Sequence, residues 1–193
     1  MEWNILFMGP VGSGKTTAIR TISDIEVVDT DMRATDDVAH MKSHTTVSMD
    51  VGKLQLGEKD KLRLCGAPGQ DRFDFMWDIL LEQCKALVLV INHASTAPLA
   101  DLEHYLKALE TRKALSSKPL ALCISHVDAR PERPLSMYAD YLRTMPQRFA
   151  AMPPVLTMDA RNKRHVRAAL MAVAAMLEMA ERFPKKHTER SGA

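Results

Sequence analysis

The sequence predicts an α/β domain in which helices cover both faces of a mostly parallel β-sheet. Short apolar runs alternate along the chain with segments whose apolar residues recur every three or four positions. Strands that are separated by helices pair in parallel. Only the short stretch Gly57-Glu58-Lys59-Asp60 separates two of the apolar runs, which indicates an antiparallel hairpin. We therefore expect a sheet of about six strands, one of them antiparallel, and about five helices.

The individual elements follow from the period of the apolar residues. The run Ala86-Leu87-Val88-Leu89-Val90-Ile91 is continuous, which is typical of a strand that is buried on both faces. The last long segment has apolar residues at helical spacing, including Val166, Leu170, Val173 and Leu177. The predicted strands cover residues 3–9, 45–56, 61–65, 85–92, 119–125 and 154–158. The predicted helices cover residues 15–23, 73–83, 98–115, 134–148 and 162–182, and the acidic segment 29–43 is predicted to be a loop.

Length and composition indicate one ordinary globular domain. The 193 residues suit a single domain over residues 1–183, followed by a flexible tail over residues 184–193. The net charge of +2 does not favour nucleic acid as a partner. The chain has no apolar stretch of membrane-spanning length and no lipidation motif, so we expect no direct membrane anchor. Three widely spaced cysteines lie inside apolar runs and are typical of reduced thiols in a cytoplasmic protein.

Residues 9–16 contain the strongest functional motif of the chain. They read Gly-Pro-Val-Gly-Ser-Gly-Lys-Thr and directly follow the first predicted strand. The pattern G-x-x-x-x-G-K-[ST] between a strand and a helix predicts a phosphate loop. Lys15 can reach the β- and γ-phosphates, and the Thr16 hydroxyl can ligate Mg²⁺. The motif therefore predicts a three-layer sandwich of the P-loop NTPase class.

Backbone amides of the loop and of the following helix would hold the remaining phosphate oxygens. We expect phosphate contacts from Gly9, Val11, Gly12, Ser13, Gly14, Lys15, Thr16 and Thr17.

Four further motifs follow in a fixed order. They are Thr45-Thr46-Val47-Ser48-Met49-Asp50, Gly66-Ala67-Pro68-Gly69-Gln70, Ser125-His126-Val127-Asp128 and Asp159-Ala160-Arg161. Together with the phosphate loop they resemble the Ras- and Arf-like small GTPases. The similarity is greatest to the bacterial group that includes the gliding-motility polarity GTPase and its relatives encoded beside roadblock-domain proteins.

The resemblance implies roles for residues around the γ-phosphate. Thr46 would reach Mg²⁺ and the γ-phosphate, with Thr45 as the alternative. The Gly69 amide would contact the γ-phosphate, and Gln70 would orient the attacking water. Arg33 is either an internal arginine finger or a solvated loop residue.

The resemblance also implies a guanine site. Asp128 would accept hydrogen bonds from guanine N1 and N2, which adenine does not offer. Ser125 would adjoin the base, and the imidazole of His126 would lie along its plane. The Ala160 amide, between Asp159 and Arg161, would meet guanine O6.

One acidic residue of the family pattern is missing, because Gly66 stands where these GTPases usually have Asp. Asp50 is the unusual acidic residue in the preceding strand. It either faces solvent or faces the nucleotide, where it would replace the lost carboxylate. In the second case it would hold Mg²⁺ through a water or place the hydrolytic water.

These features predict a switch that binds GTP and GDP with Mg²⁺, hydrolyses GTP slowly and is controlled by a roadblock-type partner. The alternatives are a nucleotide-binding scaffold with little hydrolysis and a small-molecule kinase. Residues 47–56 and the segment after Gln70 would form the partner surface. Phe73, Met76 and Trp77 are either part of that surface or part of the core.

Overall fold

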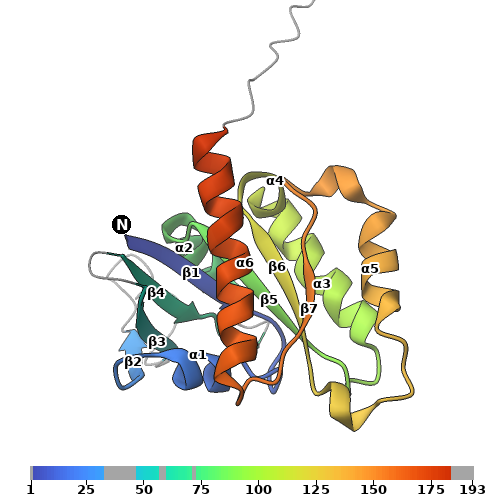
Figure 1. The fold of residues 1–193 in the computed structure, drawn as a ribbon, viewed down its shortest axis with the longest axis horizontal. Coiled ribbons are helices and arrows are strands. Elements are labelled where there is room, and N and C mark those ends of the chain that lie inside the picture. The colour runs from blue at the N-terminus through green and yellow to red at the C-terminus, as the bar shows by residue number, and fades with distance from the viewer. Residues whose placement is uncertain (1, 33–46, 57–59, 71–72, 184–193) are drawn as a thin grey trace, which may run out of the picture.

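The computed structural model describes residues 2–32, 47–56, 60–70 and 73–183 (Figure 1). They form a three-layer α/β domain around a seven-stranded sheet of order β2-β3-β4-β1-β5-β6-β7. The strands are β1 (Glu2–Met8), β2 (Val28–Met32), β3 (Val47–Gln55), β4 (Lys61–Gly66), β5 (Ala86–Asn92), β6 (Leu120–Ser125) and β7 (Val155–Thr157). The helices are α1 (Lys15–Ile22), α2 (Phe75–Gln83), α3 (Pro98–Thr111), α4 (Ala114–Ser117), α5 (Ser136–Arg143) and α6 (Lys163–Arg182), with short 3₁₀ helices η2 (Val127–Ala129) and η3 (Pro146–Arg148).

The predicted fold class is confirmed, and the described sheet has one strand more than expected. The additional strand is β2, which begins the acidic segment that we predicted to be a loop. Its backbone pairs with β3 from Val28 opposite Val51 to Met32 opposite Val47. This pairing prevails over a polar sequence with weak strand propensity, because the strand is stabilised by its neighbour rather than by its own residues.

The predicted hairpin is β3 and β4, and β3 is the one antiparallel strand of the sheet that the described residues form. It runs opposite to both β2 and β4, whereas β4, β1, β5, β6 and β7 pair in parallel. The predicted helix 98–115 is divided into α3 and α4. The division lies near Lys113, which has a positive φ of 56° and cannot continue a right-handed helix.

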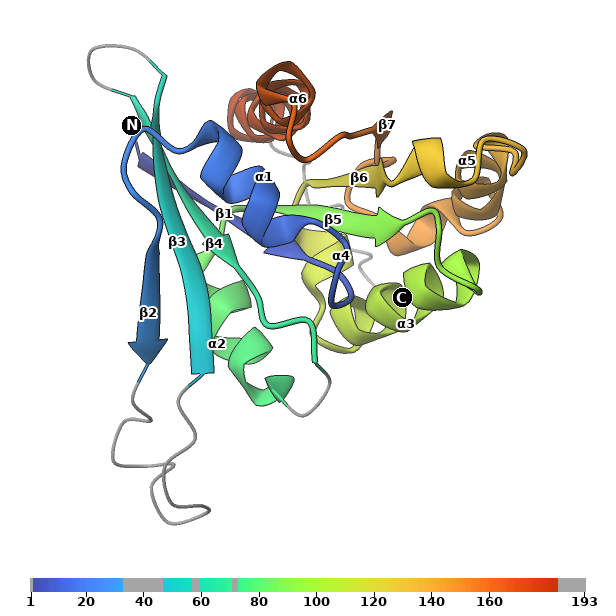
Figure 2. The same cartoon turned by 90° about the horizontal axis from the view of Figure 1, so that it is seen from below.

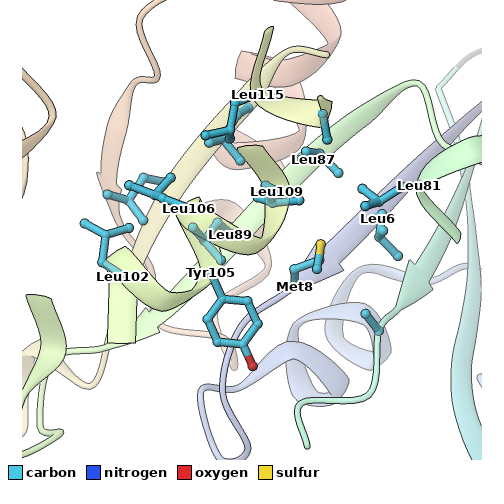
Figure 3. Packing of buried hydrophobic residues seen from close by; sticks show 14 of the residues in the cluster. Leu6, Met8, Leu81, Leu87, Leu89, Leu102, Tyr105, Leu106, Leu109 and Leu115 are labelled. Carbon is cyan, nitrogen blue, oxygen red and sulfur yellow. The ribbon is translucent and has the colours of Figure 1, made fainter. Parts of the chain in front are cut away.

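Two hydrophobic layers hold the sheet between its helices. Figure 2 shows α1 and α6 on one side of the sheet and α2 and α3 on the other. The α5 residues Tyr138 and Leu142 pack into the same layer as α2 and α3. Strand β5 supplies both layers, because its side chains alternate: Leu87 and Leu89 face α3, and Val88 and Val90 face α1 and α6. Figure 3 shows Leu6, Met8, Leu87 and Leu89 of the sheet meeting Leu102, Leu106 and Leu109 of α3.

The three cysteines are free thiols, with Cys84 and Cys123 buried and Cys65 half-buried. Burial raises the pKa of the Cys123 thiol to about 12. Within the described ranges, no helix is both long and apolar enough to cross a bilayer. The predicted tail, residues 184–193, lies outside the described residues.

We expect the central leucine layer to dominate stability. Leu89→Ala should lower the free energy of unfolding by about 2–5 kcal/mol, because it leaves a cavity at a fully buried position. Met171→Ala is the control, since this α6 side chain is 64% exposed, and it should change stability by less than about 0.5 kcal/mol. Urea unfolding of both variants measures the difference. Equal destabilisation by the two substitutions would contradict the assignment of the core.

Candidate nucleotide-binding site

The sheet topology brings the predicted motifs to one edge. The carboxyl ends of parallel strands meet at the same edge of an open sheet, and ligands of such folds bind there. The phosphate loop follows β1, residues 67–70 follow β4, residues 126–128 follow β6, and residues 159–161 follow β7. The parallel pairing therefore explains why motifs that lie far apart in the sequence belong to one site.

The phosphate loop turns sharply off β1 and continues into α1. Gly9 has a φ of +138°, and a Cβ there would lie 2.1 Å from the Val90 carbonyl oxygen, so no other residue fits this turn. Helix α1 begins with neither a side-chain cap nor an acidic residue in its first turn. Its first amides are thus left to solvent or to a bound anion.

Lys15 lies under this loop with only 8% of its surface exposed. Its ammonium group donates hydrogen bonds to the carbonyl oxygens of Gly9 at 2.7 Å and Pro10 at 2.8 Å. Burial lowers the pKa of Lys15 from its ordinary value of 10.5 to about 8, while the Asp50 carboxylate acts in the opposite direction. A phosphate beside the ammonium group would stabilise its charged form and raise this pKa.

Asp50 faces the phosphate loop. Its carboxylate accepts a hydrogen bond from the Thr16 hydroxyl. Asp50 is the direct partner of Gly66 in the β3–β4 ladder, and a Cβ at position 66 would lie 3.2 Å from the Asp50 carboxylate. The Asp50 side chain, together with the Ile19 Cδ1 atom at 3.1 Å, thus fills the space that a side chain at position 66 would enter. Of the two orientations that the sequence left open, the structure has the one toward the loop.

Two side-chain oxygen groups beside the phosphate loop are of the kind that could contribute to a magnesium site. Magnesium is usually held by one or two carboxylates together with phosphates and waters. Thr16 and Asp50 supply a hydroxyl and a carboxylate beside the phosphate loop. The described residues contain no group of three His, Cys, Asp or Glu side chains that could hold a metal ion by themselves. Thr46 and Thr45 lie outside the described residues, as does Arg33.

The loop after β4 touches the phosphate loop through Gly69. A Cβ on Gly69 would lie 2.7 Å from the Val11 nitrogen and 2.8 Å from the Gly9 carbonyl oxygen. Only glycine allows this approach. Gln70 follows with an exposed side chain.

A cavity of about 470 Å³ continues from the phosphate loop along the sheet edge. This volume lies in the range of sites that bind small molecules and cofactors. Its lining residues come from α1, from the ends of β6 and β7 and from α6: Gly14, Thr17, Ser125, His126, Val127, Asp128, Thr157, Met158, Asp159, Ala160, Arg161 and His165. Ser125, His126, Asp128 and the motif Asp159-Ala160-Arg161, from which we predicted the base site, all line it.

Ser125 connects the two halves of the site. It is 1% exposed, and its hydroxyl donates to the Ser13 carbonyl oxygen at 2.8 Å. The Nδ1 atom of His126 lies 3.0 Å from the same hydroxyl, and His126 has a φ of 54° at the start of η2. The Ser125 hydrogen bond thus connects the end of β6 to the phosphate loop. In the part of the chain that the structure describes, no side chain hydrogen-bonds to the exposed carboxylate of Asp128.

Asp159 and Arg161 form an ion pair within the last motif. The Arg161 Nε and Nη2 atoms donate to the two carboxylate oxygens at 2.9 and 3.1 Å. These hydrogen bonds lower the pKa of Asp159 to about 2, so it stays charged.

His165 also lines the cavity, and its Nδ1 accepts a hydrogen bond from the Asp159 amide at 3.2 Å. The sequence did not indicate His165. Its position three residues after Asn162, the N-cap of α6, was the one available signal.

No protein-family model matches the chain, and no curated protein matches its sequence.

The buried ammonium group of Lys15 predicts a specific pH dependence of stability. The unfolded chain keeps this proton up to about pH 10.5, whereas the folded protein loses it near pH 8. Between these values the unfolded state binds more protons, so Lys15 makes the protein more stable as the pH rises. Relative to Lys15→Met, wild-type stability should increase by about 2 kcal/mol between pH 7 and pH 10.

Urea unfolding of both proteins at several pH values measures this difference. The contributions of the other titrating groups to the pH dependence cancel in this difference, because both proteins contain them. A difference that does not change with pH would contradict the assigned environment of Lys15.

Proposed function

We propose that this protein is a small GTP-binding switch that takes up GTP or GDP together with Mg²⁺ in the cytoplasm and hydrolyses GTP slowly. One observation carries the proposal: a single cavity is lined by Gly14 of the phosphate loop, by Thr17 of α1 and by Asp128. A mononucleotide has the matching arrangement, with an anionic end and a flat base with polar edges. The phosphate loop would hold the anion, and the region around Asp128 would hold the base.

The arrangement of polar groups in the cavity favours guanine. The Asp128 carboxylate offers two acceptor oxygens, and guanine presents two adjacent donors at N1 and N2. Asp159 accepts two hydrogen bonds from Arg161, whereas Arg161 acts on Asp128 only through its charge. Asp128 is therefore the lining carboxylate whose oxygens can accept hydrogen bonds from a base. A site that leaves a carboxylate unpaired rejects a base without these donors.

Asp50 supports the magnesium-dependent part of the proposal. The missing acidic residue at position 66 was one of two reasons to consider a scaffold with little hydrolysis, the other being the altered Ser125-His126 pair. The Asp50 carboxylate lies next to Gly66 and accepts a hydrogen bond from Thr16, so the site retains a negative charge where magnesium is expected. Gln70 would orient the hydrolytic water, and Lys15 would stabilise the charge that develops on the transferred phosphoryl group.

A regulatory partner, which we propose to be of the roadblock type, would bind near the loop after β4. Phe75 and Ile79 of α2 are 47% and 43% exposed, whereas Met76 and Trp77 are buried in the core. Half-buried Phe73 packs edge-to-face with Phe75 at a centroid distance of 6.5 Å. An exposed aromatic group a few residues after Gly69, which contacts the phosphate loop, suits a partner that senses the bound nucleotide.

Calorimetric titration with GDP, a non-hydrolysable GTP analogue and ADP tests the proposal. We expect magnesium-dependent binding of the guanine nucleotides and much weaker binding of ADP. Asp128→Ala should weaken GDP binding about ten- to a hundredfold, because a charged acceptor is lost, and should leave ADP binding unchanged. Glu132→Ala is the control, since Glu132 is exposed and pairs only with Arg130 at 3.6 Å among the described residues. Equal affinity for GDP and ADP would refute the base assignment, and absence of all binding would refute the proposal.

The relation between Asp50 and Gly66 gives a second test. Mg²⁺ should raise the affinity of wild-type protein for the GTP analogue. In Asp50→Ala this increase in affinity should be smaller by a factor of about ten or more, because one charged group that would hold the ion is removed. Adding Gly66→Asp to that variant should restore a large part of this magnesium dependence. The Asp50 carboxylate no longer lies beside position 66, and the nearest remaining atom, Ile19 Cδ1 at 3.1 Å, is the flexible end of a side chain. Affinity for the analogue at increasing Mg²⁺ concentration measures both effects. Unchanged magnesium dependence in Asp50→Ala would exclude a role for this residue at the metal.

A further inference from the structure

The position of Gly69 places it in competition with a terminal phosphate. The point where a Cβ of Gly69 would lie is 2.7 Å from the Val11 nitrogen, 2.8 Å from the Gly9 carbonyl oxygen and 2.9 Å from the Lys15 ammonium nitrogen. Gly69 therefore packs directly against two hydrogen-bond donors of the phosphate loop. A phosphate oxygen that approached both donors from this side would require the glycine to move away.

The space that Gly69 occupies suits the γ-phosphate better than the inner phosphates. In a phosphate loop the backbone amides cradle the inner phosphates, and the lysine reaches outward to the β- and γ-phosphates. Val11 lies at the outer rim of the loop, with 64% of its surface exposed. The space between Val11, Lys15 and Gly69 is therefore the outer end of the anion site.

Two buried aromatic side chains hold Gly69 in this place. The Tyr105 hydroxyl donates to the Gly69 carbonyl oxygen at 3.3 Å, and the Trp77 indole nitrogen donates to the Pro68 carbonyl oxygen at 3.2 Å. Both residues are 2% exposed, and their rings stack with centroids 5.3 Å apart. Figure 3 shows Tyr105 extending from the leucine layer of α3 with its hydroxyl beyond that layer.

The aromatic pair is itself anchored to the core. Tyr105 belongs to α3 and Trp77 to α2, and both pack in the same hydrophobic layer. The Arg112 guanidinium lies 5.6 Å from the Trp77 ring and donates to Asp78 at 2.7 Å. The two hydrogen bonds thus connect the loop after β4 to a rigid part of the fold.

We propose that Tyr105 and Trp77 are positioning residues that hold the 67–70 loop against the phosphate loop and so favour a nucleoside diphosphate over a triphosphate. A triphosphate must break these hydrogen bonds to reach Lys15 and the Val11 amide, whereas a diphosphate binds without displacing Gly69. This inference rests on the proposed nucleotide-binding function and adds to it the residues that set selectivity for phosphate number.

The test compares affinities for GDP and for a non-hydrolysable GTP analogue, both with Mg²⁺. Tyr105→Phe removes one hydroxyl and keeps the stacked ring, so it should strengthen binding of the analogue about threefold or more and leave GDP binding unchanged. Tyr141→Phe is the matched control. It removes a hydroxyl that donates to Glu103 at 2.8 Å, away from the loop, and it should change neither affinity.

Trp77 fluorescence gives a second readout that does not depend on hydrolysis. The chain has two tryptophans, so Trp3→Phe leaves Trp77 as the single reporter. Binding of the triphosphate analogue should shift the Trp77 emission, because its indole loses the Pro68 carbonyl, and binding of GDP should not.

The outcomes separate the inference from the proposed function. If wild-type protein binds neither nucleotide, the proposed function fails and the inference fails with it. If wild-type protein binds both, but Tyr105→Phe leaves the ratio of the two affinities unchanged or shifts it toward GDP, only the inference is overturned. An equal change of the Trp77 emission with both nucleotides would also overturn it.

Discussion

The buried ammonium group of Lys15 is the interaction on which the rest of the site depends. A cation with so little exposed surface is tolerated because two carbonyl oxygens of the glycine-rich turn accept hydrogen bonds from it. The turn can present those oxygens because Gly9 passes close to the backbone of β5. Every other group around the loop is then placed relative to this charge. Asp50 opposes the loss of its proton, and Gly69 closes the space in front of it. The site thus surrounds a buried positive charge, which a bound anion would neutralise.

Much of the fold could be predicted from the sequence, because burial leaves a strong trace in it. Strand β5 was expected at 85–92 and lies at Ala86–Asn92, since a strand covered on both faces has no polar alternation. Helix α6 was expected at 162–182 and lies at Lys163–Arg182, since its buried face repeats with helical period. Strand β2 was missed because its residues are mostly polar. Strand β2 forms because its backbone pairs with β3. Such backbone pairing does not require a particular side-chain pattern, so the sequence of β2 does not show it.

The candidate site could be located from the order of its motifs, but its internal contacts could not. Motifs that follow successive parallel strands must gather at one edge of the sheet. The orientation of Asp50 could not be predicted, because the alternation of side chains along a strand shows which residues share a face of the sheet. It does not show which residue of the neighbouring strand pairs with Asp50. The contact from Ser125 to Ser13 spans 112 positions of the chain, and the contact from Tyr105 to Gly69 spans 36. Such contacts depend on the docking of whole elements, which local patterns do not specify.

The pairing of Asp50 with Gly66 has a consequence for how such sites can diverge. The two residues are paired on adjacent strands, so a carboxylate from either strand can reach the same place beside the phosphate loop. Exchange between the two positions passes through an intermediate with two neighbouring negative charges, which repel, or through one with none, which lacks the charge altogether. In a sequence alignment, a chain that has undergone this exchange has no acidic residue at the expected position. In the structure, the negative charge is still present, but it is carried by the neighbouring strand of the sheet.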